Sequence, residues 1–181
     1  MSFSEILRKL NNYIGTHKVH LCPEIKGRLV NNGTPLANVK ISRSLSYSDG
    51  KYTKDECFAD SNGEFEMPEM SLRSSQPALL IAERFTFQRI FVHNKNEVFL
   101  LWSSENSGIN TKPEYANKLR TLNGYITDEE ILFSFKDNHL INEYNGVSIC
   151  RWKENFQEVN NDDLYKFIDQ DSQTRIKNIS T

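Results

Sequence analysis

Residues 25–30 read Ile-Lys-Gly-Arg-Leu-Val, residues 31–41 read Asn-Asn-Gly-Thr-Pro-Leu-Ala-Asn-Val-Lys-Ile, and residues 60–65 read Asp-Ser-Asn-Gly-Glu-Phe. Apolar and charged residues alternate in the first piece, which is typical of a half-buried strand. The dipeptide Asn32-Gly33 predicts a tight hairpin turn, because glycine adopts a positive φ without a Cβ clash. A second turn is predicted at Gly63, directly before the apolar Phe65. These pieces therefore predict strands joined by tight turns.

The order of these residues resembles the pattern of the carboxypeptidase-regulatory-like, transthyretin-like family. That pattern is Gly-x-Val, then Gly-x-Pro-Leu-x-x-Val, then Thr-Asp-x-x-Gly-x-Phe, and Gly27, Gly33, Pro35 and Gly63 occupy its positions here. Ala59 stands where the family has Thr. The resemblance covers about a quarter of the chain. It implies a mainly β, antiparallel transthyretin-like β-sandwich of about seven or more strands, and it specifies a fold better than a function.

The composition describes a folded chain with no strong charge. The chain has 181 residues, 38% hydrophobic residues, 11% aromatic residues and a net charge of −2. This balance does not indicate a nucleic-acid or membrane partner. The three cysteines, Cys22, Cys57 and Cys150, have no metal-site spacing, so we expect free thiols in a reducing compartment. The alternative is one disulfide, between Cys57 and Cys150.

The N-terminal residues 1–17 are predicted to contain an amphipathic helix. Its apolar face is formed by Phe3, Ile6, Leu7, Leu10, Tyr13 and Ile14. With only two basic residues in this helix, packing against the sheet or a partner is favoured over membrane binding. Charged residues interrupt any run long enough for a signal peptide or a membrane span. We therefore expect a cytoplasmic protein, although a removed leader peptide stays an alternative.

Residues 18–155 are predicted to form the sandwich domain. We expect strands at residues 24–31, 37–44, 52–60, 63–67, 78–84, 86–93 and 97–102, polar connections at 46–51 and 70–77, and a hairpin turn at 93–96. The predicted core consists of Ile25, Leu29, Val39, Ile41, Phe65, Ile81, Phe91, Leu100 and Trp102.

The second half of the chain is harder to assign. A loop is predicted at residues 103–115, strands at 118–126 and 146–152, and a short helix from Thr127 through Phe135, where acidic residues can cap its start. Residues 156–181 are predicted to be a polar tail with a possible short helix near 164–168.

No catalytic or cofactor-binding pattern stands out. His17 and His20 are expected to be surface histidines, and the chain lacks the His-x-His of the ring-cleaving dioxygenases that share the transthyretin-like fold. It also lacks the Tyr-Arg-Gly-Ser-type tail of the hydroxyisourate hydrolases, a Gly-x-Ser-x-Gly nucleophile and a phosphate-binding loop. We therefore predict a protein that is not an enzyme, with no cofactor, metal or small-molecule substrate. An enzyme assembled from scattered residues is a minor alternative.

The favoured function is a bacterial immunity protein that neutralises a cognate toxin, of the kind delivered by type VI secretion systems. The runs Leu101-Trp102-Ser103 and Cys150-Arg151-Trp152 resemble small uncharacterised bacterial proteins found among toxin and secretion-system genes. The alternative is an adhesion, carbohydrate-binding or scaffolding module. The predicted partner-binding residues lie in the two polar loops, where aromatic and acidic side chains are free for recognition. They are Tyr47, Asp49, Tyr52, Glu105, Asn106 and Tyr115.

Overall fold

A computed structural model of the chain describes residues 3–79, 84–136 and 143–159. The protein is mainly β, and all but one of its strand pairings are antiparallel within these ranges. The helical elements are α1 (Phe3–Asn11), the 3-10 turn η1 (Gln76–Ala78) and α2 (Pro113–Leu119). The strands are β1 (His17–Cys22), β2 (Ile25–Asn31), β3 (Thr34–Pro35), β4 (Lys40–Tyr47), β5 (Tyr52–Phe58), β6 (Glu64–Met67), β7 (Met70–Ser74), β8 (Phe85–Asn94), β9 (Glu97–Ser107), β10 (Gly124–Tyr125), β11 (Ile131–Lys136), β12 (Glu143–Ser148) and β13 (Gln157–Glu158).

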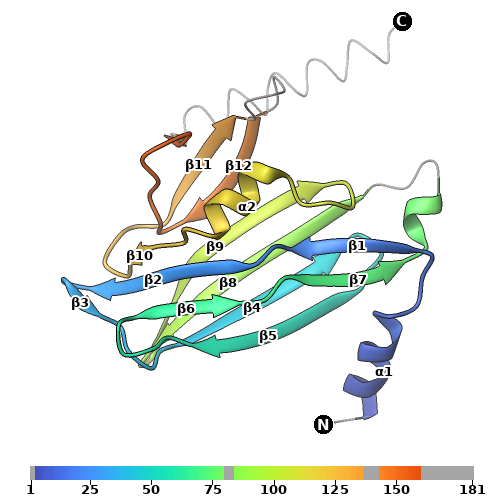
Figure 1. Cartoon of the computed structure of the whole chain (residues 1–181), viewed down its shortest axis with the longest axis horizontal. Coiled ribbons are helices and arrows are strands. Elements are labelled where there is room, and N and C mark those ends of the chain that lie inside the picture. The colour runs from blue at the N-terminus through green and yellow to red at the C-terminus, as the bar shows by residue number, and fades with distance from the viewer. Residues whose placement is uncertain (1–2, 80–83, 137–142, 160–181) are drawn as a thin grey trace, which may run out of the picture.

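The largest sheet has seven antiparallel strands in the order β13-β11-β12-β9-β8-β4-β5. Its centre is the long hairpin of β8 and β9, which turns at Lys95, a residue with a φ of 55°. The predicted hairpin at residues 93–96 is therefore confirmed. Figure 1 shows that the β11–β12 end of this sheet lies beside α2.

Two smaller sheets lie across one face of the large sheet (Figure 1). One pairs β1 with β7, and the other joins β2 to β3 and β6, with β10 added in parallel. Buried side chains from both layers form a single hydrophobic cluster, which includes Leu21 and Leu29 from the small sheets and Ile41 and Ile90 from the large one. Alternation explains which residues enter it, because every second residue of β4 is buried.

The motif residues occupy the tight turns that were predicted. Asn32 and Gly33 both have a positive φ between β2 and β3, and Gly63 has a φ of 76° before β6. Gly27 has a different role, because a Cβ there would lie 2.1 Å from the backbone oxygen of Leu122. The segment after α2 packs directly on β2 at this point, and the backbone nitrogen of Leu122 donates to the oxygen of Lys26 at 2.9 Å.

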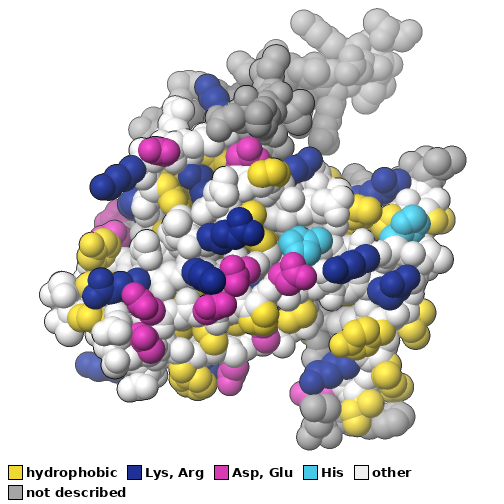
Figure 2. Space-filling view, viewed as in Figure 1, with side chains coloured by type: hydrophobic (Ala, Val, Ile, Leu, Met, Phe, Trp, Pro, Cys, Tyr) yellow, Lys and Arg dark blue, Asp and Glu magenta, His cyan; other side chains and the backbone are white. Residues whose placement is uncertain are grey.

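The outer face of the β2–β6 pair is charged. Figure 2 shows basic and acidic side chains interleaved over this part of the surface. Lys26 forms ion pairs with Glu24 at 3.2 Å and Glu66 at 3.7 Å. Such exposed ion pairs contribute little to stability, so the face is held by its backbone pairing and its buried side.

One charged side chain is fully buried in the large sheet. Arg43 lies on the inner face of β4, and its guanidinium forms a two-point contact with the Asp55 carboxylate of β5. Its Nη1 atom donates to the backbone oxygen of Pro68 at 2.9 Å. Nearby, burial raises the pKa of the Cys22 thiol to about 12. Arg43 is thus a buried cation whose charge is balanced by one carboxylate.

The core prediction is largely confirmed. Ile25, Leu29, Val39, Ile41, Phe65 and Trp102 are buried. Phe91 and Leu100 are only half-buried, because they face each other on the outer side of β8 and β9 after a register shift at Ile90. Ile81 lies outside the described residues. All three cysteines are free thiols, so the alternative disulfide is wrong.

Several predicted elements of the middle and second half are wrong. Residues 76–78 form η1 where a strand was predicted from 78, and residues 80–83 of that strand lie outside the described residues. The connection predicted at 70–77 contains β7. The loop predicted at 103–115 contains the end of β9 and the start of α2. The strand predicted at residues 118–126 is replaced by the end of α2 and the two-residue strand β10. The helix predicted at residues 127–135 is replaced by most of strand β11.

At the ends of the chain, α1 is confirmed and begins at Phe3. It ends at Asn11, and the residues that follow lead into β1, a strand that was not predicted. The strand predicted at 146–152 begins earlier and ends at Ser148. The helix predicted near 164–168 and most of the tail lie outside the described residues.

The apolar face of α1 does not pack on the sheets. Ile6, Leu7 and Leu10 are exposed, and so are Tyr13 and Ile14 just after the helix. In Figure 1 the helix projects from the end of the molecule, and Figure 2 shows hydrophobic side chains gathered on it. Packing of this face on a partner stays a prediction. Among the described residues no helix is long and apolar enough to cross a membrane.

Candidate functional site

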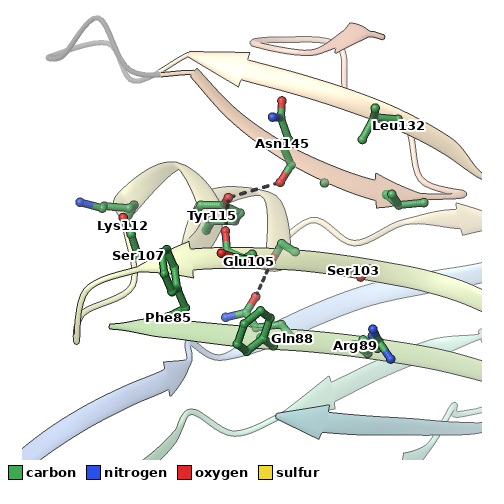
Figure 3. Close-up of a pocket in the computed structure, with 14 residues that line it drawn as sticks. Phe85, Gln88, Arg89, Ser103, Glu105, Ser107, Lys112, Tyr115, Leu132 and Asn145 are labelled. Atoms are coloured by element: carbon green, nitrogen blue, oxygen red, sulfur yellow. Dashed lines mark hydrogen bonds between the residues drawn. The ribbon is translucent and has the colours of Figure 1, made fainter. Parts of the chain in front are cut away.

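The candidate site is a groove at the place where β9 and β12 separate. These strands pair only at Ser104–Gly146 and Ser103–Val147. Further along, the Tyr115 hydroxyl from α2 lies between them, 2.9 Å from the backbone oxygen of Glu105 and 3.3 Å from that of Asn145 (Figure 3). The hydroxyl has one proton to donate, so the shorter contact identifies the Glu105 oxygen as its main acceptor. A side chain therefore occupies the position of the missing strand pairing.

The groove has a volume of about 920 Å³. Its floor and walls come from β8, β9, β11, β12, α2 and the residue before α2. Strand alternation turns Phe85, Phe87 and Arg89 outward on β8, whereas Thr86, Gln88 and Ile90 are buried. The lining residues are Phe85, Phe87, Gln88, Arg89, Ser103, Ser104, Glu105, Ser107, Lys112, Tyr115, Leu132, Asn145, Gly146 and Val147.

The lining combines three kinds of contact. Phe85 and Phe87 offer ring surface, Arg89 and Lys112 offer positive charge, and Glu105 offers a carboxylate. Figure 3 shows Phe85 and Lys112 near one end and Arg89 farther along β8. Aromatic and arginine side chains beside polar ones are typical of the surfaces that proteins use to bind other proteins.

A buried hydrogen-bond network supports the groove from below. The indole nitrogen of Trp102 donates to Gln88 Oε1 at 3.1 Å and to Ser104 Oγ at 3.0 Å. The amide nitrogen of Gln88 donates to the backbone oxygen of Leu21 on β1 at 2.7 Å. All of these groups are buried, so the network ties β8 and β9 to the smaller sheet behind them and makes the floor rigid.

A cluster of aromatic rings holds α2 in place. Tyr115 packs edge-on against Trp102 with ring centroids 6.0 Å apart, and against Phe135 at 5.0 Å. Phe133 of β11 contacts Trp102 at 5.8 Å and Trp152 at 5.1 Å. Edge-to-face and tilted pairs of this kind add to the stability gained from burial alone. The cluster therefore fixes the position of the Tyr115 hydroxyl in the groove wall.

Lys118 lies at the far side of this cluster. Its side chain is only 5% exposed, and Nζ lies 4.9 Å from the ring centroid of Trp152 and 5.2 Å from that of Phe135. Among the described residues, Nζ has one hydrogen bond, a long one of 3.4 Å to the backbone oxygen of Glu154. Burial lowers the pKa of Lys118 from 10.5 to about 8, because the charged form loses hydration.

This pKa predicts a specific pH dependence of stability. Between about pH 8 and 10.5 the unfolded chain binds more protons at Lys118 than the folded chain, so stability rises with pH in this window. The cost of burying the charge is fully present below pH 8. We expect Lys118→Met to be more stable than wild type at pH 7 by on the order of 1–2 kcal/mol, allowing for partial screening by solvent.

Urea unfolding of both proteins at pH 7 and pH 10 checks this expectation. The gap between Lys118→Met and the wild type should shrink at the higher pH, since wild-type Lys118 then folds largely uncharged. A Lys118→Met variant less stable than the wild type at pH 7 would contradict the expectation and show that the ammonium–ring contacts are net stabilising.

The structure brings together two of the six predicted binding residues. Glu105 is exposed and lies in the groove, and the Tyr115 hydroxyl reaches its backbone, although the rest of Tyr115 is buried. Asn106 points to the opposite side of β9, where it is buried and donates to the backbone oxygen of Asn110 at 3.2 Å. Asn106 was therefore wrongly predicted to be exposed, since β9 continues through it.

The other three predicted residues lie around the β4–β5 turn. Tyr47 is only 2% exposed, so the prediction that it is free for recognition is wrong. The pKa of its phenol is raised, mainly by burial and to a smaller extent by the negative charge of Asp49. Asp49 is exposed and accepts a hydrogen bond from Ser74 Oγ at 2.7 Å. Tyr52 is exposed on the edge strand β5. The turn reaches the groove through Ser48, whose backbone nitrogen donates to the oxygen of Phe85 at 3.0 Å.

Sequence reasoning missed most of the groove. Phe87 and Arg89 were assigned to a strand, but nothing marked their face as the outer one. Alternation was the available signal, because it places Phe87 and Arg89 on the opposite face from Gln88 and Ile90. An exposed face that carries aromatic residues often marks an interaction site. Asn145 carried no local signal at all, since its role depends on a strand pairing forty residues away in sequence.

Comparison with known proteins places the chain in a family. A family model described as a domain of unknown function, DUF6795, matches residues 25–129, which is more than half of the chain. The chain belongs to the DUF6795 family. No curated protein and no solved structure matches it.

The DUF6795 match divides the groove. It includes the β8 and β9 residues, Lys112 and Tyr115, but excludes Leu132 and the β12 residues of the opposite wall. It also excludes α1 and β1. Within the ranges that the structure describes, no group of three or more His, Cys, Asp or Glu residues is placed to hold a metal ion.

Proposed function

We propose that this protein is a non-catalytic binding protein of the bacterial immunity type, which neutralises a cognate secretion-system toxin in the cytoplasm by stoichiometric binding. The groove above β8, β9 and β12 is the proposed binding surface. The observation that carries this proposal is the lining, in which Phe87, Arg89 and Glu105 are all exposed on one wall. A polypeptide can pack on the ring and pair with both charges.

The geometry of the groove supports binding of a protein segment. Its floor is held by the buried Trp102–Gln88 network and its far wall by Tyr115, so the exposed side chains stand on a rigid base. A preorganised surface loses little conformational entropy when a partner docks. Arg89 and the aromatic residues are the types that contribute most to protein–protein affinity.

The assignment to toxin neutralisation rests on sequence resemblance. The runs at residues 101–103 and 150–152 resemble bacterial proteins encoded among toxin genes, and the motif at residues 27–65 resembles transthyretin-like sandwiches. We propose that the two layers of sheets form such a sandwich. In this proposal, the groove is the surface that binds and covers the toxin.

The proposal is tested by reversing charges in the groove. Arg89→Glu and Glu105→Lys should each weaken the complex with a toxin encoded beside this gene about 30-fold, equivalent to the roughly 2 kcal/mol of a hot-spot residue. Lys54→Glu is the matched control, since it makes the same change on β5, away from the groove. Binding is measured by calorimetry, and protection is measured as survival of cells that express the toxin.

Equal binding and protection by the groove variants and the wild type would place the recognition surface elsewhere, with the exposed face of α1 as the next candidate. Capture of a glycan and no protein from the native host would favour the adhesion or carbohydrate-binding alternative.

A further inference from the structure

A second cavity lies between α2 and the segment of residues 151–155. Its volume is about 570 Å³, which is within the roughly 300–1,000 Å³ of sites that bind small molecules. Its polar lining includes Glu114, Lys118, Asn123 and Trp152. No residue lines both this cavity and the groove, although α2 contributes to each, so it is a separate site.

Three buried polar groups border this cavity without adequate partners. Glu114 is 8% exposed, and its Oε2 atom accepts no hydrogen bond. The indole nitrogen of Trp152 is buried and has no hydrogen-bond acceptor among the described residues. Within the described ranges, Lys118 Nζ has one long hydrogen bond, to the backbone oxygen of Glu154, and otherwise lies over aromatic rings. Buried polar groups normally have hydrogen-bond partners. A bound ligand could supply the partners that these groups lack within the described part of the protein.

Pairing within the protein does not account for these groups. Lys118 lies one helical turn after Glu114, yet the Oε2 atom of Glu114 receives no hydrogen bond from it. Arg151 also borders the cavity, but its guanidinium is engaged with Glu158 at 3.3 Å and with the backbone oxygens of Ile149 and Glu129. Lys118 is therefore the buried cation that is available to a ligand.

We propose that this cavity binds an α-amino or α-amido carboxylate, which is a carboxylate with an N–H group on the adjacent carbon. Lys118 Nζ and the indole N–H of Trp152 donate to the carboxylate, and Glu114 Oε2 accepts from the ligand N–H. A free amino acid and the C-terminal residue of a polypeptide share this chemistry. The proposal stands independently of toxin binding in the groove.

Calorimetry of the full-length protein with three sets of probes tests the proposal. The probes are the twenty amino acids, their N-acetyl derivatives and their N-acetyl amides. We expect at least one carboxylate to bind with a Kd below about 1 mM, and its amide to bind at least tenfold more weakly. Binding of N-acetyl derivatives identifies a polypeptide C-terminus as the source, and binding of free amino acids alone identifies a metabolite. Absence of binding in all sets, or equal binding of acids and amides, overturns the proposal.

Variants connect binding to the named residues. Lys118→Met keeps a long apolar side chain on the aromatic rings and should reduce affinity at least tenfold, as a lost charge-assisted hydrogen bond implies. Glu114→Gln should reduce the affinity of a free amino acid more than that of an N-acetyl derivative, because only the former is cationic. Lys54→Met is the control for loss of a positive charge. Unchanged affinity in a folded Lys118→Met variant overturns the proposal. Arg89→Glu should not affect this binding.

Discussion

Replacing Trp102 by Ala should lower the free energy of unfolding by about 3–5 kcal/mol, the range for removing a large buried aromatic side chain. Trp102 is fully buried, and it packs against Tyr115, Phe133 and Trp152. The substitution leaves a cavity at the centre of this cluster. It also removes the indole donor from Gln88 Oε1, which keeps the hydrogen bond from the Ser104 hydroxyl.

Urea unfolding monitored by far-UV circular dichroism measures this loss. Trp102→Phe is the matched control, because it keeps most of the ring volume and loses the indole N–H, and we expect it to cost on the order of 1–2 kcal/mol. An alanine variant no less stable than the phenylalanine variant would show that the aromatic cluster collapses to fill the space.

Breaking the Arg43–Asp55 pair should have an effect of similar size. Asp55→Ala leaves the fully buried guanidinium with the backbone oxygen of Pro68 and the neighbouring Cys22 thiol, and with no carboxylate from its own pair. An uncompensated buried charge typically costs about 3–5 kcal/mol. We expect the lower end of this range, because Asp55 is 26% exposed and water can enter where its carboxylate was removed.

A double substitution separates the cost of the orphaned charge from the value of the pair. Arg43→Met together with Asp55→Ala should be clearly more stable than Asp55→Ala alone, since it removes the buried cation. Denaturant midpoints of the three variants and the wild type provide the comparison. A double variant as unstable as Asp55→Ala would mean that the lost packing of the arginine stem, and not its charge, sets the cost.

Local patterns determined the first part of the fold. The turns at Asn32-Gly33 and Gly63 were predicted because their backbone conformation depends on the turn residues themselves. The buried face of β2 and β4 followed from alternation of neighbouring residues. The predicted strand ended at residue 44, whereas the alternation continues to Tyr47. Extending the strand by three residues would have placed Tyr47 in the core.

The second half depended on contacts that short segments do not encode. Residues 128–130 are acidic and favour the start of a helix, but Phe133 and Phe135 pack on Trp102 and Tyr115 as part of a strand. In a six-residue strand such packing outweighs local propensity. Pro113 and Glu114 did mark the start of α2, because proline suits the first turn of a helix, but the loop composition around them obscured this signal.

The sequence by itself determined the antiparallel strands around the motif, the amphipathic α1 and the exposure of Glu105. Tertiary structure alone decided the groove, because it exists where the pairing of β9 with β12 ends and the Tyr115 hydroxyl enters between them. It also decided the second cavity, which needs Trp152 beside a helix more than thirty residues earlier. Backbone conformation is a property of neighbouring residues, whereas a binding surface depends on which distant segments the core brings together.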